Sequence, residues 1–372
     1  MKPLSVLIVG GGTGGHLSPG IAVYEECRAR GVEVYFLAGN NDRRFTYMSD
    51  VDSENLFYYN APSLTRNIFK LPFFLIGFLW AVLRGMSYLG KLEISAVIGM
   101  GGYVSAPLLI AARIKGIPLY LCEQNSVPGK VTRYFAKYAR AVFSTFEVTR
   151  EYLKNGENMI TVGNPIRKKV FVKATREEAR AHFNMKHCRQ VILAIGGSQG
   201  ALKINELMLG LKKTFPGDFK DVGIIWSTGD YSYEKYKKLV QEELGGGSVF
   251  LSPFITNVGL AYLASDIAIS RSGSGVMMEL AAMGIPSILI PYPFAAQDHQ
   301  NTNADEFVNA GAALKIMNDE AVPQKVGPVI LDILNSRTQL ARMSEKALAA
   351  SRKNAAQDIV DRIAEFHKQA AV

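Results

Sequence analysis

The chain has 372 residues, of which 48% are hydrophobic and 20% charged, with a formal net charge of +9. This length and composition predict a soluble α/β protein of two domains, each with its own core, and exclude a disordered or fibrous chain. The positive charge indicates an acidic partner, which is a nucleic acid, an anionic lipid or a phosphate-bearing substrate.

Three widely spaced cysteines, Cys27, Cys122 and Cys188, show no metal-ligand spacing and indicate a reducing cytosolic compartment. The first residues pass directly into an apolar strand, so we expect no signal peptide. No run reaches the roughly 20 apolar residues that a membrane-spanning helix needs. We therefore expect a cytoplasmic protein without a spanning segment.

The chain begins with an apolar strand at 6–9, a glycine turn at 10–15 and a helix that ends by Gly31. A dinucleotide-binding fold begins in the same way, but it usually has an acidic residue at the end of its second strand. Here the second strand, at 33–38, ends in Gly-Asn-Asn, which argues against NAD. His16 closes the glycine turn, where it either acts as a general base or caps the helix.

Asp50 and Asp52 resemble the paired acids that hold a divalent metal in one class of sugar-nucleotide enzymes. They lie in a polar stretch, so we expect a solvated loop and no metal site.

The segment 71–83 is apolar on all sides and contains several aromatic residues, with Lys70 and Arg84 at its ends. Thirteen residues are too few to cross a bilayer. The segment suits either a membrane surface or a buried core helix.

Strands at 96–100 and 119–122 each end in a glycine or polar loop, which places Tyr103, Glu123 and Asn125 beyond strand ends. Ligands of open α/β sheets bind at that edge. We expect the next helix to carry four cations on one side, for anionic headgroups or for solvent: Lys130, Arg133, Lys137 and Arg140. Nucleic acid binding has no supporting stacking pattern.

Asn164 and Pro165 end the first half, and Arg167 follows where a cleft between domains would open. The same pattern then restarts with a strand at 191–195, a glycine turn at 196–201 and a helix at 202–215. We therefore expect two Rossmann-like domains, at 1–164 and 165–351. A final helix at about 352–372 is expected to pack back on the first domain.

The segment 270–304 is the expected centre of a donor site. A strand at 267–269 ends in Ser-Arg-Ser-Gly and a helix follows, so backbone N–H groups and the positive end of the helix dipole would face a diphosphate. Glu279 lies one to two turns into that helix, either facing a ribose diol or solvated. Gln300 lies beyond the next strand, at 287–290.

Six motifs together resemble the MurG family, the UDP-N-acetylglucosamine:lipid I N-acetylglucosaminyltransferases. They are Gly-Gly-Thr-Gly-Gly-His at 11–16, Met-Gly-Gly-Tyr-Val-Ser-Ala-Pro at 100–107, Glu-Gln-Asn at 123–125, Val-Gly-Asn-Pro-Ile-Arg at 162–167, Gly-Gly-Ser-Gln-Gly-Ala at 196–201 and the segment 270–304. The resemblance runs from about residue 6 to residue 315.

The resemblance implies a GT-B arrangement, in which two Rossmann-like domains with parallel sheets face each other across a cleft, with no metal or other cofactor. It implies transfer of GlcNAc from UDP-GlcNAc to the C4 hydroxyl of MurNAc in undecaprenyl-linked lipid I, with inversion at C1. The product, lipid II, serves peptidoglycan synthesis. The enzyme would be peripheral on the cytoplasmic face of the bacterial plasma membrane, with an anionic surface and no nucleic acid as partner.

Carried over by position, the resemblance implies three groups of residues. Donor contacts would come from Thr13, Gly14, Gly15, Asn125, Arg167, Ser198, Ile255, Ser274, Gly275, Val276, Met277, Met278, Glu279 and Gln300. The acceptor side would be formed by His16, Tyr103 and Glu123. Membrane contacts would come from Phe73, Phe74, Phe78, Trp80, Lys70, Arg84, Lys137 and Arg140. We expect His16 to be the base, with Glu123 as the competing base or as the residue that orients His16.

Two other reactions on the same fold remain as alternatives, a UDP-GlcNAc 2-epimerase and a diacylglycerol glycosyltransferase. A lipid-binding or nucleic-acid-binding module with an inactive nucleotide site is a third.

Overall fold

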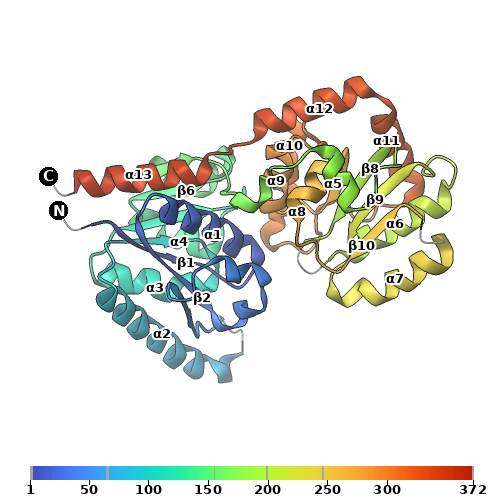
Figure 1. Cartoon of the computed structure of the whole chain (residues 1–372). Coiled ribbons are helices and arrows are strands. Elements are labelled where there is room, and N and C mark those ends of the chain that lie inside the picture. Colours follow the sequence, from blue (N-terminus) through green and yellow to red (C-terminus); the bar gives the residue numbers. More distant parts are fainter. Residues whose placement is uncertain (1–2, 64–66, 155, 198–199, 245–246, 371–372) are drawn as a thin grey trace. The chain divides into compact units, whose positions relative to one another are not determined.

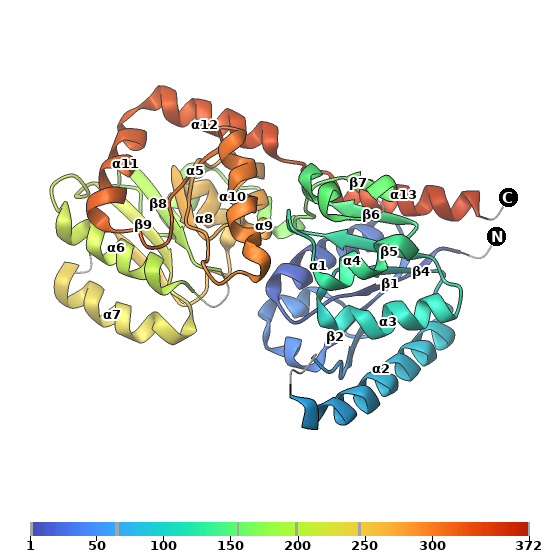
Figure 2. The same ribbon diagram turned by 180° about the vertical axis from the view of Figure 1, so that it is seen from behind.

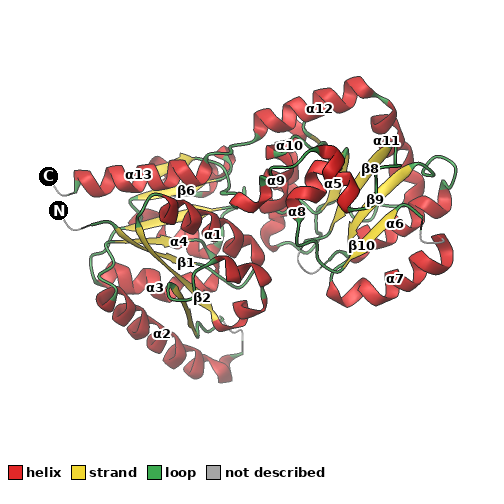
Figure 3. Cartoon of the chain, viewed as in Figure 1, coloured by secondary structure: helices red, strands yellow, loops and turns green. Residues whose placement is uncertain are grey.

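The computed structural model describes residues 3–63, 67–154, 156–197, 200–244 and 247–370. The chain divides into two compact units. The first unit comprises Met1–Lys168 with Arg352–Val372, and the second comprises Lys169–Ser351. Within each unit, helices cover both faces of a sheet (Figure 1 and Figure 3). The expected α/β class with two parallel-sheet domains is confirmed.

The first unit contains, among its described residues, a seven-stranded parallel sheet in the order β3-β2-β1-β4-β5-β6-β7. Its strands are β1 Ser5–Val9, β2 Glu33–Gly39, β3 Leu56–Tyr59, β4 Ala96–Gly99, β5 Leu119–Glu123, β6 Ala141–Ser144 and β7 Met159–Thr161. Its α-helices are α1 Gly14–Ala29, α2 Leu71–Lys91, α3 Gly102–Ile114, α4 Lys130–Phe135 and α13 Ala355–Gln369.

Strand β1 shows why the strands of this sheet are continuous apolar runs. Successive side chains of a strand point to opposite faces. Val6 and Ile8 join a core with residues of α1 and α13, whereas Leu7 and Val9 join a second core with residues of α2 and α3. Because both faces are covered, every residue of β1 is buried.

The second unit contains, among its described residues, a six-stranded parallel sheet in the order β10-β9-β8-β11-β12-β13. Figure 2 shows the helices of this unit around its strands. Its strands are β8 Gln190–Ile195, β9 Val222–Ser227, β10 Val249–Ser252, β11 Ile267–Ser270, β12 Ser287–Leu289 and β13 Ala313–Lys315. Its α-helices are α5 Arg176–His182, α6 Leu202–Thr214, α7 Asp230–Leu244, α8 Val258–Ala264, α9 Ser274–Ala282, α10 His299–Asn309, α11 Pro323–Asn335 and α12 Arg337–Ala350.

The C-terminal helix α13 belongs to the first unit and packs on α1. Arg30 of α1 pairs with Asp361 of α13, and the rings of Tyr120 and Phe366 stack with centroids 6.1 Å apart. The chain passes between the units after Lys168 and again after residue 351. The boundary expected from the sequence, after residue 164, lies four residues earlier than the first of these junctions.

Two expectations are corrected by helix α2. The sequence predicted an apolar segment of 13 residues, and it predicted no run long enough to cross a membrane. The helix has 21 residues, and an 18-residue window in it has a mean hydropathy of 1.5, so one described helix is long and apolar enough for a span. Arg84 and Gly85 end the apolar run but not the helix, because one side of it packs on α3 through Ala81, Gly85 and Leu89. Packing therefore extends the helix beyond its apolar sequence.

The helix expected to carry four cations on one side is also corrected. Helix α4 ends at Phe135, Lys137 lies in a short 3₁₀ helix, and Arg140 leads into β6. These two cations nevertheless lie close together, because they line the same hollow at the surface, with Arg113 at the end of α3.

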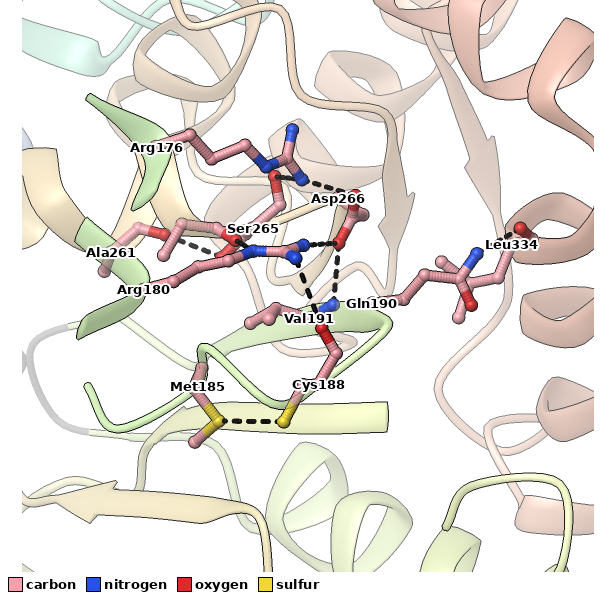
Figure 4. Close-up of polar contacts among 11 residues, drawn as sticks. Arg176, Arg180, Met185, Cys188, Gln190, Val191, Ala261, Ser265, Asp266 and Leu334 are labelled. Carbon is pink, nitrogen blue, oxygen red and sulfur yellow. Dashed lines mark hydrogen bonds and ion pairs between the residues drawn. The ribbon is translucent and has the colours of Figure 1, made fainter. Parts of the chain in front are cut away.

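A partly buried ionic network fixes α5 to the sheet of the second unit, as Figure 4 shows. Asp266, just before β11, accepts hydrogen bonds from Arg180 at 2.7 Å and from the backbone N–H of Val191 in β8 at 2.7 Å, and it also pairs with Arg176. Both strands begin here, so the network braces the amino edge of the sheet. The loops described below lie at the opposite, carboxyl edge of the sheet.

Candidate active site

In the first unit, the glycine turn after β1 places His16 on the first turn of α1. The Oγ1 of Thr13 and the Nδ1 of His16 are 2.9 Å apart and share a hydrogen bond. Thr13 occupies the N-cap position, so His16 is not the cap that the sequence allowed. If Nδ1 carries the hydrogen and donates it to Thr13, the basic lone pair of the imidazole is on Nε2.

The second glycine turn, after β4, packs directly against the ring of His16. A Cβ atom on Gly101 would lie 3.1 Å from Cδ2 of His16, and one on Gly102 would lie 3.2 Å from its Nδ1. Both glycines have positive φ angles, +88° and +74°, which other residues adopt only with strain. Strands β1 and β4 are neighbours in the sheet, so the two turns meet at its carboxyl edge.

Tyr103 follows the second turn on α3 and is 37% exposed. Its ring lies over the first turn, since a Cβ atom on Gly12 would be 3.0 Å from its Cε1. The structure thus brings Tyr103, His16 and the residues 12–15 together.

Glu123, at the end of β5, is 5% exposed and holds the loop that follows it. Its Oε1 accepts the backbone N–H of Asn125, and its Oε2 accepts that of Gly129, both at 3.1 Å. Strand β5 neighbours β4, so this loop lies at the same sheet edge as the glycine turns. Both carboxylate oxygens of Glu123 therefore already accept backbone N–H groups of the loop.

In the second unit, the loop after β11 leads into α9 with Gly273 at its N-cap. Gly275 and Val276 are partly exposed on the first turn, whereas the side chains of Ser274, Met277 and Met278 are buried. A ligand above this loop would therefore meet backbone groups rather than the methionine side chains.

Three loops at the carboxyl edge of this sheet are tied together. Asn303 of α10, which is fully buried, donates its Nδ2 to the carbonyl oxygen of Ser272 at 3.1 Å. Arg271 donates Nη1 to the carbonyl oxygen of Ile290 at 3.0 Å and to Oδ1 of Asn318 at 2.8 Å. The loop before α9 is thereby fixed to those that follow β12 and β13.

Glu279 differs from the outward-facing residue that its place in the helix predicts. It is 8% exposed, and its Oε2 accepts a hydrogen bond of 2.5 Å from the hydroxyl of Tyr262 in α8. A ligand can therefore contact this carboxylate only through its small exposed part, where α8 and α9 are joined by this hydrogen bond.

The other predicted donor residues lie in different surroundings. Ser198 is outside the described residues. Ile255 is buried after β10, and the Oε1 of Gln300 accepts the backbone N–H of Tyr292 at 2.9 Å. Gln300 therefore has its amide N–H₂ as the group to offer a ligand.

Arg167 belongs to the first unit and is 7% exposed. It pairs with Asp50 at 3.5 Å and lies 5.1 Å from the centroid of the Tyr47 ring. Its Nε has no hydrogen-bond partner among the described residues. The sequence placed it in the second domain and facing a ligand, whereas here the guanidinium is mostly enclosed by its own unit.

Asp50 and Asp52, which resembled a metal-binding pair, take part in separate ionic contacts. Asp52 accepts the hydroxyl of Tyr24 at 2.9 Å and pairs with Arg28 at 3.2 Å, while Asp50 pairs with Arg167. In the part of the chain that the structure describes, no group of three His, Cys, Asp or Glu residues could hold a metal ion.

A second surface of the first unit is apolar and basic. Along α2, Phe73 and Trp80 are 76% and 67% exposed, whereas Phe74 and Phe78 are half-buried and pack on each other. Other exposed apolar side chains of this region are Phe69, Leu75, Ile76, Leu79 and Leu83. Lys70 and Arg84 are exposed beside them.

Helix α3 links this apolar surface to the basic hollow, because it packs on both α2 and α4. The hollow has a volume of about 370 Å³ and is lined by Arg113, Lys137 and Arg140 around Tyr138. Hydrogen bonding to Lys137 lowers the pKa of Tyr138, over whose ring the guanidinium of Arg113 lies at 3.6 Å. The sequence did not single out Arg113, since the basic pattern that it joins is formed only by folding.

Residues 6–144 match the glycosyltransferase family 28 N-terminal domain, and residues 191–363 match the C-terminal domain of the same family. Similar full-length proteins carry the name UDP-N-acetylglucosamine--N-acetylmuramyl-(pentapeptide) pyrophosphoryl-undecaprenol N-acetylglucosamine transferase. The one from Desulforamulus reducens is 32% identical over 96% of this chain and 97% of its own length. The one from Aquifex aeolicus is 34% identical over 91% of this chain and 94% of its own length.

Solved structures show the same fold. The crystal structure of Acinetobacter baumannii MurG has a TM-score of 0.72 and 26% identity, and it covers 97% of this chain and 99% of its own. A UDP-GlcNAc 2-epimerase from Neisseria meningitidis has a TM-score of 0.69 but 14% identity, over 97% of this chain and 100% of its own, which shows the fold alone. The family resemblance read from the sequence motifs is thereby confirmed, and the chain belongs to the MurG family of glycosyltransferase family 28.

Proposed function

We propose that this chain transfers GlcNAc from UDP-GlcNAc to the C4 hydroxyl of MurNAc in lipid I, with inversion at C1, to form lipid II. The main support is the near-complete match to relatives named for this reaction. The arrangement at the carboxyl edge of each sheet agrees with it, because both units present glycine-rich loops there.

On the donor side, the backbone at the start of α9 would hold the diphosphate. Breaking the bond between C1 and the phosphate oxygen leaves the electron pair on UDP, so N–H donors and the helix dipole stabilise the charge that develops. Gly275 and Val276 are the partly exposed residues of that turn. Glu279 would accept ribose hydroxyls, with Tyr262 orienting its carboxylate. The other donor contacts stay predictions, and they are Gln300, Ile255, Ser198, Arg167, Thr13, Gly14, Gly15 and Asn125.

On the acceptor side, we assign the base to His16. The C4 hydroxyl oxygen forms its bond to C1 while Nε2 of His16 takes the proton, a step worth roughly 100-fold to 10,000-fold in rate. The hydrogen bond to Thr13 supports this assignment because it can hold the tautomer that leaves Nε2 basic. Glu123 is the weaker choice, since both of its oxygens already accept backbone N–H groups.

At the membrane, we propose that the exposed side of α2 inserts into the surface of the cytoplasmic leaflet while Lys70, Arg84, Lys137 and Arg140 face anionic headgroups. Burial of a large apolar side chain contributes about 1.5–3 kcal/mol. Each cation near an anionic surface adds about 1 kcal/mol. This surface suits a peripheral attachment, because the other side of α2 packs on α3.

The decisive experiment is transfer of labelled GlcNAc from UDP-GlcNAc to purified lipid I, with undecaprenyl phosphate as the control acceptor. We expect labelled lipid II, equal turnover with Mg²⁺ and with EDTA, and no product from the control. Conversion of UDP-GlcNAc without any acceptor would instead identify an epimerase. Transfer to diacylglycerol would identify the other glycosyltransferase, and a failure to bind UDP in calorimetry would indicate an inactive nucleotide site.

A further inference from the structure

Asp42, a residue outside all the proposed contacts, holds the first glycine turn from inside the protein. It lies three residues after β2 and is 1% exposed. Its Oδ1 accepts the backbone N–H of Gly12 at 3.0 Å, and its Oδ2 accepts the N–H groups of Gly12 at 3.1 Å and Gly39 at 2.9 Å. One carboxylate therefore joins the end of β2 to the turn that follows β1.

The turn and the carboxylate fit each other without spare space. A Cβ atom on Gly11 would overlap Oδ2 of Asp42, and one on Gly39 would lie 3.0 Å from the same oxygen. From the other side, the ring of Tyr103 lies over Gly12. The turn is thus clamped between Asp42 and Tyr103, immediately before Thr13.

We propose that Asp42 is a positioning residue for the reaction, which fixes the turn carrying Thr13 and His16. Its carboxylate sets the path of Gly12, Gly12 sets that of Thr13, and Thr13 orients the imidazole of His16. This inference rests on the proposed function. It adds a residue that touches neither substrate.

The test is Asp42→Asn, which keeps the size of the side chain but turns an NH₂ group toward a backbone N–H. Misplacement of a catalytic group by about 1 Å costs on the order of 100-fold. We expect kcat for GlcNAc transfer to fall 10-fold to 100-fold, while the KM for UDP-GlcNAc and the Kd for UDP stay close to the wild-type values. A general loss of folding would instead change all three.

Asp52→Asn is the matched control, because Asp52 lies in the same unit and contacts Tyr24 and Arg28 instead of the turn. Its kcat should stay near that of the wild type. Asp42→Ser, which removes the carboxylate and adds no NH₂ group, is a second test. Its kcat should fall at least as far as that of Asp42→Asn, because the N–H groups of Gly12 and Gly39 lose their acceptor.

The outcomes separate this inference from the proposed function. A wild-type protein that transfers no GlcNAc to lipid I would reject the function itself. If the wild type is active and Asp42→Asn is as active as Asp52→Asn, the positioning role is wrong. If neither Asp42 variant folds, as judged by thermal unfolding, Asp42 is a folding residue and the inference is rejected.

Discussion

The hydrogen bond between Tyr262 and Glu279 offers a sharp test of the donor site. Tyr262 is 1% exposed in α8, and its hydroxyl donates to Oε2 of Glu279 at 2.5 Å. In Tyr262→Phe the ring keeps its packing and only the hydroxyl is lost, so no large cavity forms. What changes is the hydrogen bond that orients a mostly buried carboxylate.

A hydrogen bond to a charged group contributes about 1.5–3 kcal/mol, and each 1.4 kcal/mol is a factor of ten in binding. If Glu279 accepts the ribose hydroxyls, we expect the Kd of UDP to rise roughly 10-fold in Tyr262→Phe. Isothermal titration with UDP measures this directly. Thermal unfolding of the same samples separates a loss of stability from a loss of binding.

The control is Tyr236→Phe, since Tyr236 is equally buried in the same unit but packs on Trp226. This variant should bind UDP like the wild type. If Tyr262→Phe also binds UDP like the wild type, Glu279 is an interior group and the assignment of the ribose to it is refuted. Glu279→Gln should then be equally harmless to binding.

Four further predictions concern other parts of the molecule. Thr13→Val removes the partner of His16 Nδ1, so kcat should fall about 10-fold or more and the pH–rate profile should shift. Trp80→Ser should weaken co-sedimentation with anionic vesicles by about 1.5–3 kcal/mol, and added salt should weaken binding further through the cations. Burial raises the pKa of the Cys27 thiol to about 12, above an unfolded value of about 8.5. The buried neutral thiol therefore contributes its full stabilisation of the folded state below the unfolded pKa. This contribution is lost as pH rises through about 12, so the free energy of unfolding in urea should fall above about pH 9. Asp266→Asn removes the charge with which Arg176 and Arg180 pair and should destabilise the second unit by about 1.5–3 kcal/mol in urea unfolding.

Each of these has a contrasting result. Wild-type kcat in Thr13→Val would show that the hydroxyl does not fix the imidazole. Tyr231→Ser, at a 99% exposed aromatic residue of the second unit, should leave vesicle binding unchanged. Rapid reaction of Cys27 with a thiol reagent in the native protein at pH 8 would contradict its burial. Glu242→Gln breaks an exposed pair with Lys238 and should cost about 0–1 kcal/mol.

The sequence predicted most of the fold because its signals are local. An apolar run followed by a glycine turn and a helix indicates the same unit wherever it occurs, and the seven strands predicted above correspond to strands of the two sheets. The glycines at 101 and 102 have the positive φ angles that such turns need. The short strands β3, β6 and β7 were not predicted, since their few residues stand out only once neighbouring strands pair with them.

The site was predicted less completely, because its geometry depends on partners far apart in the chain. Asp42 is the clearest case. The sequence argument looked for an acidic residue at the end of β2 and found Gly-Asn-Asn. Asp42 follows these three residues directly, and its carboxylate accepts the backbone N–H of Gly12 in the glycine turn. Nothing in the sequence indicates that Tyr262 contacts Glu279, because the two residues are 17 positions apart and meet only when α8 and α9 pack together.

By itself, then, the sequence determined the class of fold, the family and the loops at which chemistry is expected. Those properties follow from residue types at fixed spacing. Only the tertiary structure decided which of those groups are already bonded or buried within the protein. Glu123 accepts backbone N–H groups, Arg167 pairs with Asp50, and Glu279 is mostly buried. Burial and pairing are properties of contacts between distant segments, and the sequence does not encode them at any single position.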